Sequence, residues 1–289
     1  MGIDVHGLNF LRYASRKQPL GKIATIGRQA MALSPFSLAR IMGARVSISP
    51  NSFCEEFLTK YLAATMVESF DFSSYEGATY VVDMNEPIQP PREYDTVIDF
   101  GCVEHIYNAP QALKNISMLC AAGGQIIHVL PANNFCGHGF WQFSPEVFFS
   151  LYCDENGYRD TEVFLADLKK SDRWFEVTKP SGGKRAQVTS SCPLYVMCRT
   201  RKSALVSHDR VQQSDYLVAW ADASKDKVQP GGAYAALRKM IGRNPFLNVF
   251  LGSVYRSLVK TAGRLQNPTA LSNRNQHLKR RDVHKLLAN

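Results

Sequence analysis

The chain has 289 residues, of which 45% are hydrophobic, and this composition suits one good-sized domain with an extension. It contains no run of about 18 apolar residues, and its N-terminus lacks the apolar segment of a secretory signal, so we expect neither a spanning helix nor a leader. The net charge of +9 is uneven, because residues 201–289 hold 16 Lys and Arg against 5 Asp and Glu, which leaves 18 against 20 for residues 1–200. This shift predicts a nearly neutral domain over 1–200 and a basic helical extension over 201–289.

Apolar segments indicate the elements of the first third of the chain. They predict a helix over 5–17 and strands over 22–27, 65–71 and 78–83. Ser52 and Glu55 have the spacing of a capping box, which predicts a helix that runs from there to about Ala63. The prolines of the following segment predict a loop, because proline cannot donate to a strand ladder.

Residues 94–131 read as a buried strand, a polar loop, an amphipathic helix and a second buried strand. Asn108 and Pro110 predict the start of the helix, and Gly123 with Gly124 predicts its end. Such a β-α-β unit has parallel strands, and ligands of parallel sheets bind at the carboxyl ends of the strands. The loop that carries Glu104 and His105 therefore lies at the expected ligand-binding edge.

The next segments predict the rest of the sheet. Ser144 and Pro145 predict the start of another helix, in which the hydroxyl caps the first turn. Strands are expected over 161–165 and 194–198, and the polar segment 169–192 is expected to be an excursion at the sheet edge.

The order of these elements over 94–131 resembles class I S-adenosylmethionine-dependent methyltransferases, and the resemblance covers about residues 22–200. It implies an α/β fold with a Rossmann-like, mostly parallel sheet and helices on both faces, and S-adenosyl-L-methionine as the cofactor. The glycine-rich turn of this family retains only Gly27 here, followed by Arg28. Arg28 would pair with the cofactor carboxylate, block the pocket, or be a solvated loop residue.

The resemblance also assigns further cofactor-binding residues. It places Asp71 against both ribose hydroxyls, since one carboxylate can accept from two donors. It places Asp83 near the adenine amine and Met84 against the adenine face, and it adds Gly101 to the cofactor site. Either Asp is alternatively a turn residue that accepts hydrogen bonds from backbone amides.

For the chemical step, His105 and His138 are the candidate bases, because histidine titrates near neutral pH. Glu104 would orient His105 or replace it. Asn134, His138 and Trp141 lie in a loop of amides and aromatic rings that resembles a substrate lining, although its aromatic residues are alternatively core anchors. We expect no metal to be needed, because the sequence has neither an HExxH motif nor clustered carboxylate ligands.

The basic extension contains an expected helix over 244–265 with an apolar stripe and a basic row. This helix would lie on an anionic membrane surface, or pack on the domain or on a second subunit as in a homo-oligomer. The cluster of Lys279, Arg280 and Arg281 lacks a nucleic-acid-binding motif, so we expect no nucleic acid, and residues from about 266 are expected to be disordered. Seven scattered cysteines without a CxxC pair indicate free thiols in a reducing cytoplasm, with the protein there or peripheral to the inner face of the membrane.

These interpretations together predict methyl transfer to oxygen or nitrogen of a small molecule or glycan. The overall resemblance to methyltransferase-like proteins of surface-polysaccharide biosynthesis favours the glycan. The alternative is a catalytically inactive scaffold that binds a protein or membrane partner through its basic tail. A dinucleotide-binding enzyme is disfavoured, because GxGxxG is absent after the first strand.

Overall fold

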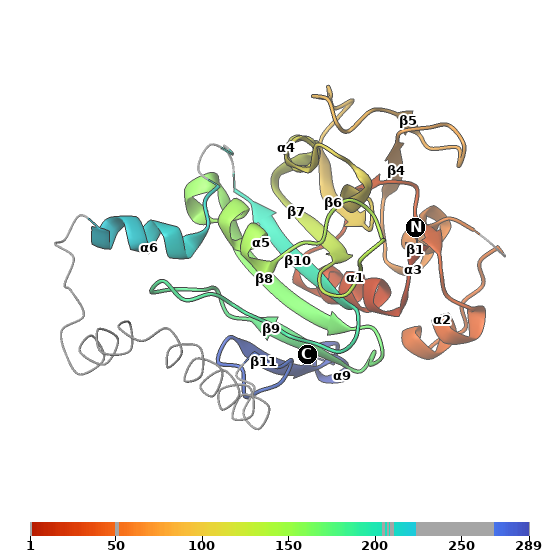
Figure 1. Cartoon of the computed structure of the whole chain (residues 1–289). Coiled ribbons are helices and arrows are strands. Elements are labelled where there is room, and N and C mark those ends of the chain that lie inside the picture. The colour runs from red at the N-terminus through yellow and green to blue at the C-terminus, as the bar shows by residue number, and fades with distance from the viewer. Residues whose placement is uncertain are drawn as a thin grey trace, which may run out of the picture.

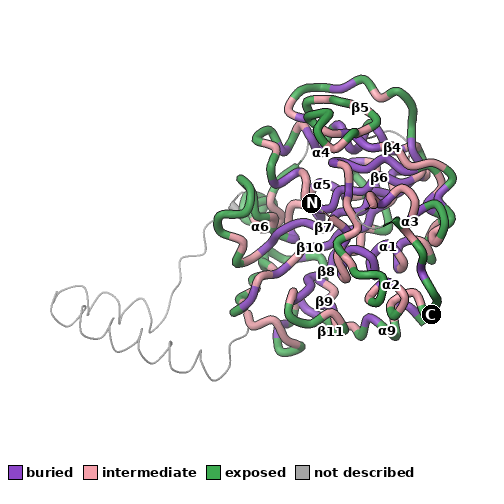
Figure 2. The backbone as a smooth tube through the Cα atoms, turned by 90° about the vertical axis from the view of Figure 1, so that its right-hand side faces the viewer, coloured by how far each residue is buried: buried purple, intermediate pink, exposed green. Residues whose placement is uncertain are grey.

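The computed structural model describes residues 2–49, 52–203, 206, 208, 211–223 and 269–288. A sheet of nine described strands forms its centre, in the order β11-β9-β8-β10-β7-β6-β2-β4-β5 (Figure 1). The strands run through the molecule as largely buried segments, and the exposed residues lie around them (Figure 2). The fold is therefore Rossmann-like α/β, as the sequence predicts.

One half of the sheet is parallel. It consists of β2 (Lys22–Ile26), β4 (Met66–Asp71), β5 (Tyr80–Val81), β6 (Tyr94–Phe100) and β7 (Cys120–Pro131). After β2 the chain adds β4 and β5 on one side, and it then returns to place β6 and β7 on the other side. Such a reversal of strand order opens a crevice at the carboxyl ends of the central strands, where ligands of doubly wound sheets bind.

The other half is antiparallel and extends the sheet by four strands. These are β8 (Tyr158–Asp167), β9 (Arg173–Val177), β10 (Leu194–Lys202) and β11 (Leu278–Asp282). Strand β10 lies between β7 and β8 and is antiparallel to both, while β11 pairs with β9 at the edge. A separate two-stranded sheet joins β1 (Gly2–Ile3) to β3 (Ala30–Met31) near the start of the chain.

Helices cover both faces of the sheet. Side chains of α1 (Val5–Lys17), α2 (Pro35–Met42), α3 (Cys54–Tyr61) and α9 (Val283–Leu286) share one core cluster. Those of α4 (Ala109–Leu119) and α5 (Pro145–Leu151) share the other, and α6 (Ser214–Ala223) follows β10. Neighbouring strand residues alternate between the two clusters, as Val97 and Ile98 do, because successive side chains of a strand point to opposite faces. Among the described helices none has the length and apolar character that crossing a membrane would require.

Several local signals in the sequence are confirmed. Helix α1 occupies the predicted 5–17, and Asn108 caps α4 by accepting a hydrogen bond from the amide of Gln111 at 3.4 Å. Ser144 caps α5 by accepting from the amide of Glu146 at 3.2 Å. All seven cysteines lie in the described part of the chain and are free thiols.

Two other local signals gave wrong predictions, one for the start of α3 and one for the end of α4. No side chain caps α3, and Glu55 bonds to Arg28 instead of closing a capping box with Ser52, so that prediction was wrong. Helix α4 ends at Leu119, and Gly123 lies inside β7 with φ of +81°, next to an irregular register with β6. The glycine pair thus accommodates a bulge in the strand rather than ending the helix.

Three further segments differ from the secondary structure that the sequence predicts. The segment 169–192 contains the strand β9, and the expected strand over 78–83 is only two residues long. Residues 278–282, expected to be disordered, form the edge strand β11. The helix expected over 244–265 lies outside the described residues.

Candidate functional site

The central crevice begins at the turn after β2. Gly27 has φ of +70°, a conformation that favours glycine, and its amide donates to the carbonyl of Phe70 at the end of β4 at 2.7 Å. The next amide, of Arg28, donates to the Asp71 carboxylate at 3.2 Å. The turn thus brings together Gly27, Arg28 and Asp71, three of the residues that the resemblance assigned to cofactor binding.

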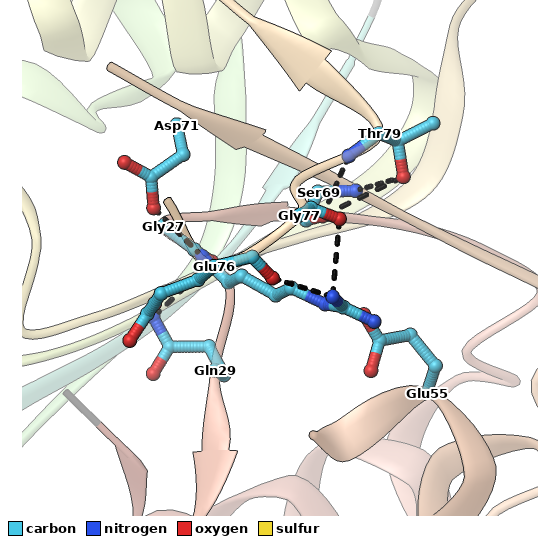
Figure 3. Close-up of polar contacts among 9 residues, drawn as sticks. Gly27, Gln29, Glu55, Ser69, Asp71, Glu76, Gly77 and Thr79 are labelled. Atoms are coloured by element: carbon cyan, nitrogen blue, oxygen red, sulfur yellow. Dashed lines mark hydrogen bonds and ion pairs between the residues drawn. The ribbon is translucent and has the colours of Figure 1, made fainter. Parts of the chain in front are cut away.

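The Arg28 side chain is bound to the protein on several sides. Its Nε donates to the Glu55 carboxylate at 2.7 Å, and a terminal nitrogen donates to the carbonyls of Glu76 and Gly77 (Figure 3). Its guanidinium also stacks over the Phe53 ring, 4.1 Å from the centroid. These contacts contradict the interpretation of Arg28 as a solvated loop residue. Its guanidinium is hydrogen-bonded to acceptors of the protein itself.

The other assigned cofactor residues lie nearby in different environments. Asp71 is half-buried at the carboxyl end of β4. Asp83 is exposed and accepts hydrogen bonds from the amide and the side chain of Asn85, at 2.9 and 2.7 Å, which is the turn role foreseen as its alternative. Met84 is buried in the core beneath α4, so its side chain contacts the protein interior.

A buried polar network fixes the loop after β6. Asp99 accepts hydrogen bonds from the amides of Cys102 and Val103 at 3.2 and 3.3 Å. Its other oxygen lies 2.8 Å from Nδ1 of His128, whose Nε2 lies 2.6 Å from the Tyr152 hydroxyl. Because Asp99 and His128 are fully buried, these bonds hold the loop at a defined position.

This loop presents Glu104, which is the most unusual side chain of the site. Its carboxylate is 1% exposed, yet neither oxygen accepts a hydrogen bond from any described residue. Burial, with a further contribution from the charge of Asp99, raises the pKa of Glu104 to about 8. Oε1 of Glu104 lies 3.8 Å from Nε2 of His105 and 3.6 Å from Nε2 of His138.

The two histidines approach each other above this carboxylate. Their rings cross at 69° with centroids 5.1 Å apart, and both side chains are about half exposed. Burial and the neighbouring His138 lower the pKa of His105. The three predicted catalytic residues therefore form one cluster, although they come from two separate loops.

A cavity of about 140 Å³ opens beside this cluster. Its lining combines the start of α1 with the ends of β6 and β7, and includes Asp4, Phe100, Gly101, Glu104, His138 and Tyr195. Gly101, assigned to the cofactor site by the sequence, thus lines the same cavity as the candidate catalytic residues.

The loop after β7 is fastened to the Glu104 backbone. The amides of Phe140 and Trp141 donate to the Glu104 carbonyl at 2.7 and 3.2 Å. Gly139 makes this approach possible, because a Cβ atom at that residue would lie 2.7 Å from the same carbonyl oxygen. This contact seats His138 over Glu104.

The predicted substrate residues Asn134 and Trp141 differ in whether their side chains are free to contact a ligand. The Asn134 side-chain amide donates to Ser190 and to the Cys192 carbonyl at 2.9 to 3.1 Å, so it fastens segment 190–192. Trp141 remains 41% exposed beside the exposed rings of Tyr107 and Phe140, at centroid distances of 6.5 Å from Tyr107 to Trp141 and 6.0 Å from Tyr107 to Phe140. These three rings form an open aromatic surface next to the histidines.

Comparison with known proteins gave structural similarities only. No family model matches the chain, and no curated protein matches it significantly. A SAM-dependent methyltransferase from Thermotoga maritima aligns with 69% of this chain and 91% of its own at 15% identity and a TM-score of 0.34. The N-methyltransferase NodS of Bradyrhizobium japonicum, in complex with S-adenosyl-L-homocysteine, aligns with 68% and 84% at 12% identity and a TM-score of 0.38. An O-methyltransferase of Brevibacillus brevis, from a polyketide synthase, aligns with 68% and 72% at 10% identity and a TM-score of 0.38.

Four residues around Glu104, His105 and His138 were not predicted from the sequence. Two of them are buried in the sheet, and two line the cavity. Asp99 and His128 were hidden within apolar strands, and only their polarity at fully buried positions of β6 and β7 signals a role. Asp4 and Tyr195 reach the cavity from the two ends of the domain sequence, which no local pattern indicates.

Proposed function

We propose that this chain is an S-adenosylmethionine-dependent methyltransferase that acts on oxygen or nitrogen of a small molecule or glycan. The observation that carries the proposal is the convergence of two sets of residues on one crevice. Gly27 and Asp71 lie at the ends of β2 and β4, and the cluster of Glu104, His105 and His138 lies at the ends of β6 and β7. Cofactor and acceptor would thus meet at the point where the strand order reverses.

The cofactor would lie along the ends of β2 and β4. Asp71 accepts from the amides of Arg28 and Ser73, one on each oxygen, and its remaining lone pairs would accept from the ribose hydroxyls. Strand β2 pairs in parallel with β4 on one side and with β6 on the other, so Asp71 and the loop after β6 lie at the same edge of the sheet. A cofactor bound at Asp71 would therefore have its methyl group within reach of this loop.

The acceptor would lie over the histidines. The open rings of Tyr107, Phe140 and Trp141 offer flat apolar faces that suit a sugar ring or another planar group. Methyl transfer from a sulfonium is an in-line displacement, so the cluster's main task is to position the acceptor atom. Glu104, His105 or His138 would take the proton that the acceptor loses.

Calorimetric titration with S-adenosyl-L-methionine and S-adenosyl-L-homocysteine tests the proposal. The wild-type chain should bind both, and Asp71→Asn should weaken binding about 10- to 100-fold, because hydrogen bonds to a charged group contribute about 1.5 to 3 kcal/mol. Asp160→Asn is the matched control, since Asp160 is an exposed carboxylate at the start of β8. Unchanged affinity in Asp71→Asn, or no binding by the wild-type chain, would contradict the proposal.

One observation favours a second candidate function. Arg28 fills the turn where the resemblance expects small residues, and its guanidinium is held by Glu55, Phe53 and two carbonyls. A chain that had lost cofactor binding would have this arrangement, and it would then serve as a scaffold for a protein or membrane partner. The same titration separates the two functions, because the scaffold binds neither ligand.

A further inference from the structure

Glu104, His105 and His138 stand apart from the other polar clusters of the described chain. Their potential ligand atoms, one carboxylate oxygen and two imidazole nitrogens, all lie within 4.8 Å of one another. A buried carboxyl group ordinarily has hydrogen-bond partners around it, because leaving a polar group unsatisfied in the interior costs free energy whether or not the group is ionised. Glu104 has none among the described residues.

Two imidazole nitrogens flank this carboxyl group. Nε2 of His138 and Nε2 of His105 lie 3.6 and 3.8 Å from the same carboxylate oxygen, Oε1. These distances are too long for hydrogen bonds but close to the ligand separation around a bound ion. Two ligands held at about 2.0 to 2.1 Å from Zn²⁺ in a tetrahedron lie about 3.3 Å apart. The half-exposed histidines can close this difference by small side-chain rotations.

We propose that Glu104, His105 and His138 form a binding site for a divalent first-row transition metal ion. Two imidazoles and one carboxylate are a ligand set of Zn²⁺ and of neighbouring ions such as Co²⁺ and Mn²⁺. Three protein ligands leave at least one coordination position open, as in catalytic rather than structural metal sites. The inference departs from the expectation drawn from sequence motifs, because the ligands come from two loops separated by more than thirty residues.

The surrounding structure keeps the three ligands in place. Asp99 fixes the loop of Glu104 and His105 through the amides of Cys102 and Val103. The Glu104 carbonyl receives the amides of Phe140 and Trp141, which ties the second loop, with His138, to the first. A site whose ligands are positioned before the ion arrives loses less entropy on binding.

The open coordination position would face the cavity lined by Asp4, Gly101 and Tyr195. If the proposed methyltransferase function holds, the ion would bind the acceptor oxygen or nitrogen there and lower its pKa, and the proton would pass to solvent water. Glu104, His105 and His138 would then act as metal ligands rather than as bases. This role rests on the proposed function, whereas metal binding itself does not. Metal binding is therefore measured without cofactor or acceptor, so that the failure of one proposal is distinguishable from the failure of the other.

The test is titration of metal-free, full-length protein with Co²⁺, followed by visible absorption, and then displacement by Zn²⁺. All variants carry Cys136→Ser, because Cys136 is an exposed thiol of the same loop as His138 and would otherwise compete. We expect one Co²⁺ per chain with nitrogen and oxygen ligands, and a rise in Tm on adding Zn²⁺. Glu104→Gln, His105→Gln and His138→Gln should each weaken binding more than about 100-fold, since even second-shell changes cost about 10- to 100-fold.

A control variant and a folding check accompany the metal titration. His284→Gln is the matched control, because His284 is an exposed histidine on α9 and should leave the affinity unchanged. His138→Gln changes a half-exposed side chain, so it should fold even where Glu104→Gln does not, and circular dichroism checks this. Absence of Co²⁺ binding, full binding in His138→Gln, or sulfur-to-cobalt charge-transfer absorption in place of nitrogen and oxygen ligation would overturn the proposal.

Discussion

Asp99 connects two strands of the sheet to the loop of the candidate site. It is fully buried at the end of β6 and bonds to His128 in β7 and to two amides of the following loop. Asp99→Ala would remove the carboxylate from all three contacts at once and leave His128 unpaired on one side. We therefore expect this substitution to be among the most destabilising in the chain.

The magnitude follows from the burial of the pair. Asp99→Ala takes their partner from the amides of Cys102 and Val103 and from Nδ1 of His128, and each buried polar group left unsatisfied costs about 1 to 3 kcal/mol, so the free energy of unfolding should fall by about 3 kcal/mol or more. For a domain of this size each kcal/mol shifts Tm by about 2 to 4 °C, so the fall in Tm should be roughly 10 °C. Tyr152→Phe removes only the bond to Nε2 of His128 and should cost about 1 to 3 kcal/mol.

Urea unfolding followed by circular dichroism measures these values, and an unchanged m-value shows that the unfolded state is comparable. Tyr107→Phe is the control for Tyr152→Phe, because its ring is 74% exposed and the change should stay within about 0.5 kcal/mol. A loss below about 1 kcal/mol in Asp99→Ala would refute the reasoning, since it would mean that the network contributes no more than an ordinary surface contact.

Two further substitutions probe the loops around the site. Gly139→Ala should destabilise the protein by more than the about 1 to 2 kcal/mol that a left-handed alanine costs, because its Cβ would also press on the Glu104 carbonyl. Gly137→Ala is the control, because Gly137 also has a positive φ but has no atom within 4 Å of the added Cβ, so this variant should show the backbone cost alone. Equal losses of unfolding free energy in the two variants would contradict this account. Arg28→Met should lower the free energy of unfolding by about 1 to 3 kcal/mol in thermal or urea denaturation, because it removes bonds to Glu55 and to two carbonyls. Lys60→Met is its control, since Lys60 makes an exposed pair with Glu56, and a similar loss there would show that the Arg28 contacts have no special weight.

The elements that the sequence predicted well carry their own local signals. Asn108 and Pro110 start α4, and Ser144 and Pro145 start α5, because capping and fixed φ act within one turn of the chain. The strands β6 and β7 are apolar on both faces and are therefore recognisable without knowledge of their partners.

The failures involve contacts between distant parts of the chain. Glu55 has the spacing of a capping residue, but Arg28, twenty-seven positions earlier, binds its carboxylate. The edge strand β11 is rich in Lys and Arg, and only its pairing with β9 makes it a strand. The same holds for the site. Glu104 and His105 were predicted together because they share one loop, whereas the approach of His138 to Glu104 and the bond between Asp99 and His128 depend on the fold.

The pairing of β11 with β9, more than one hundred residues apart in the sequence, has a consequence for biosynthesis. Strand β11 and α9 are the last described segments to leave the ribosome, yet Val283 packs in the same core cluster as Leu8 and Phe10 of α1. Until they emerge, β9 presents an open edge with unpaired amides and carbonyls, which is a template for pairing with other chains. Truncation before residue 278 would therefore yield a chain prone to self-association, and folding of the α1 face would be completed only after Val283 has left the ribosome.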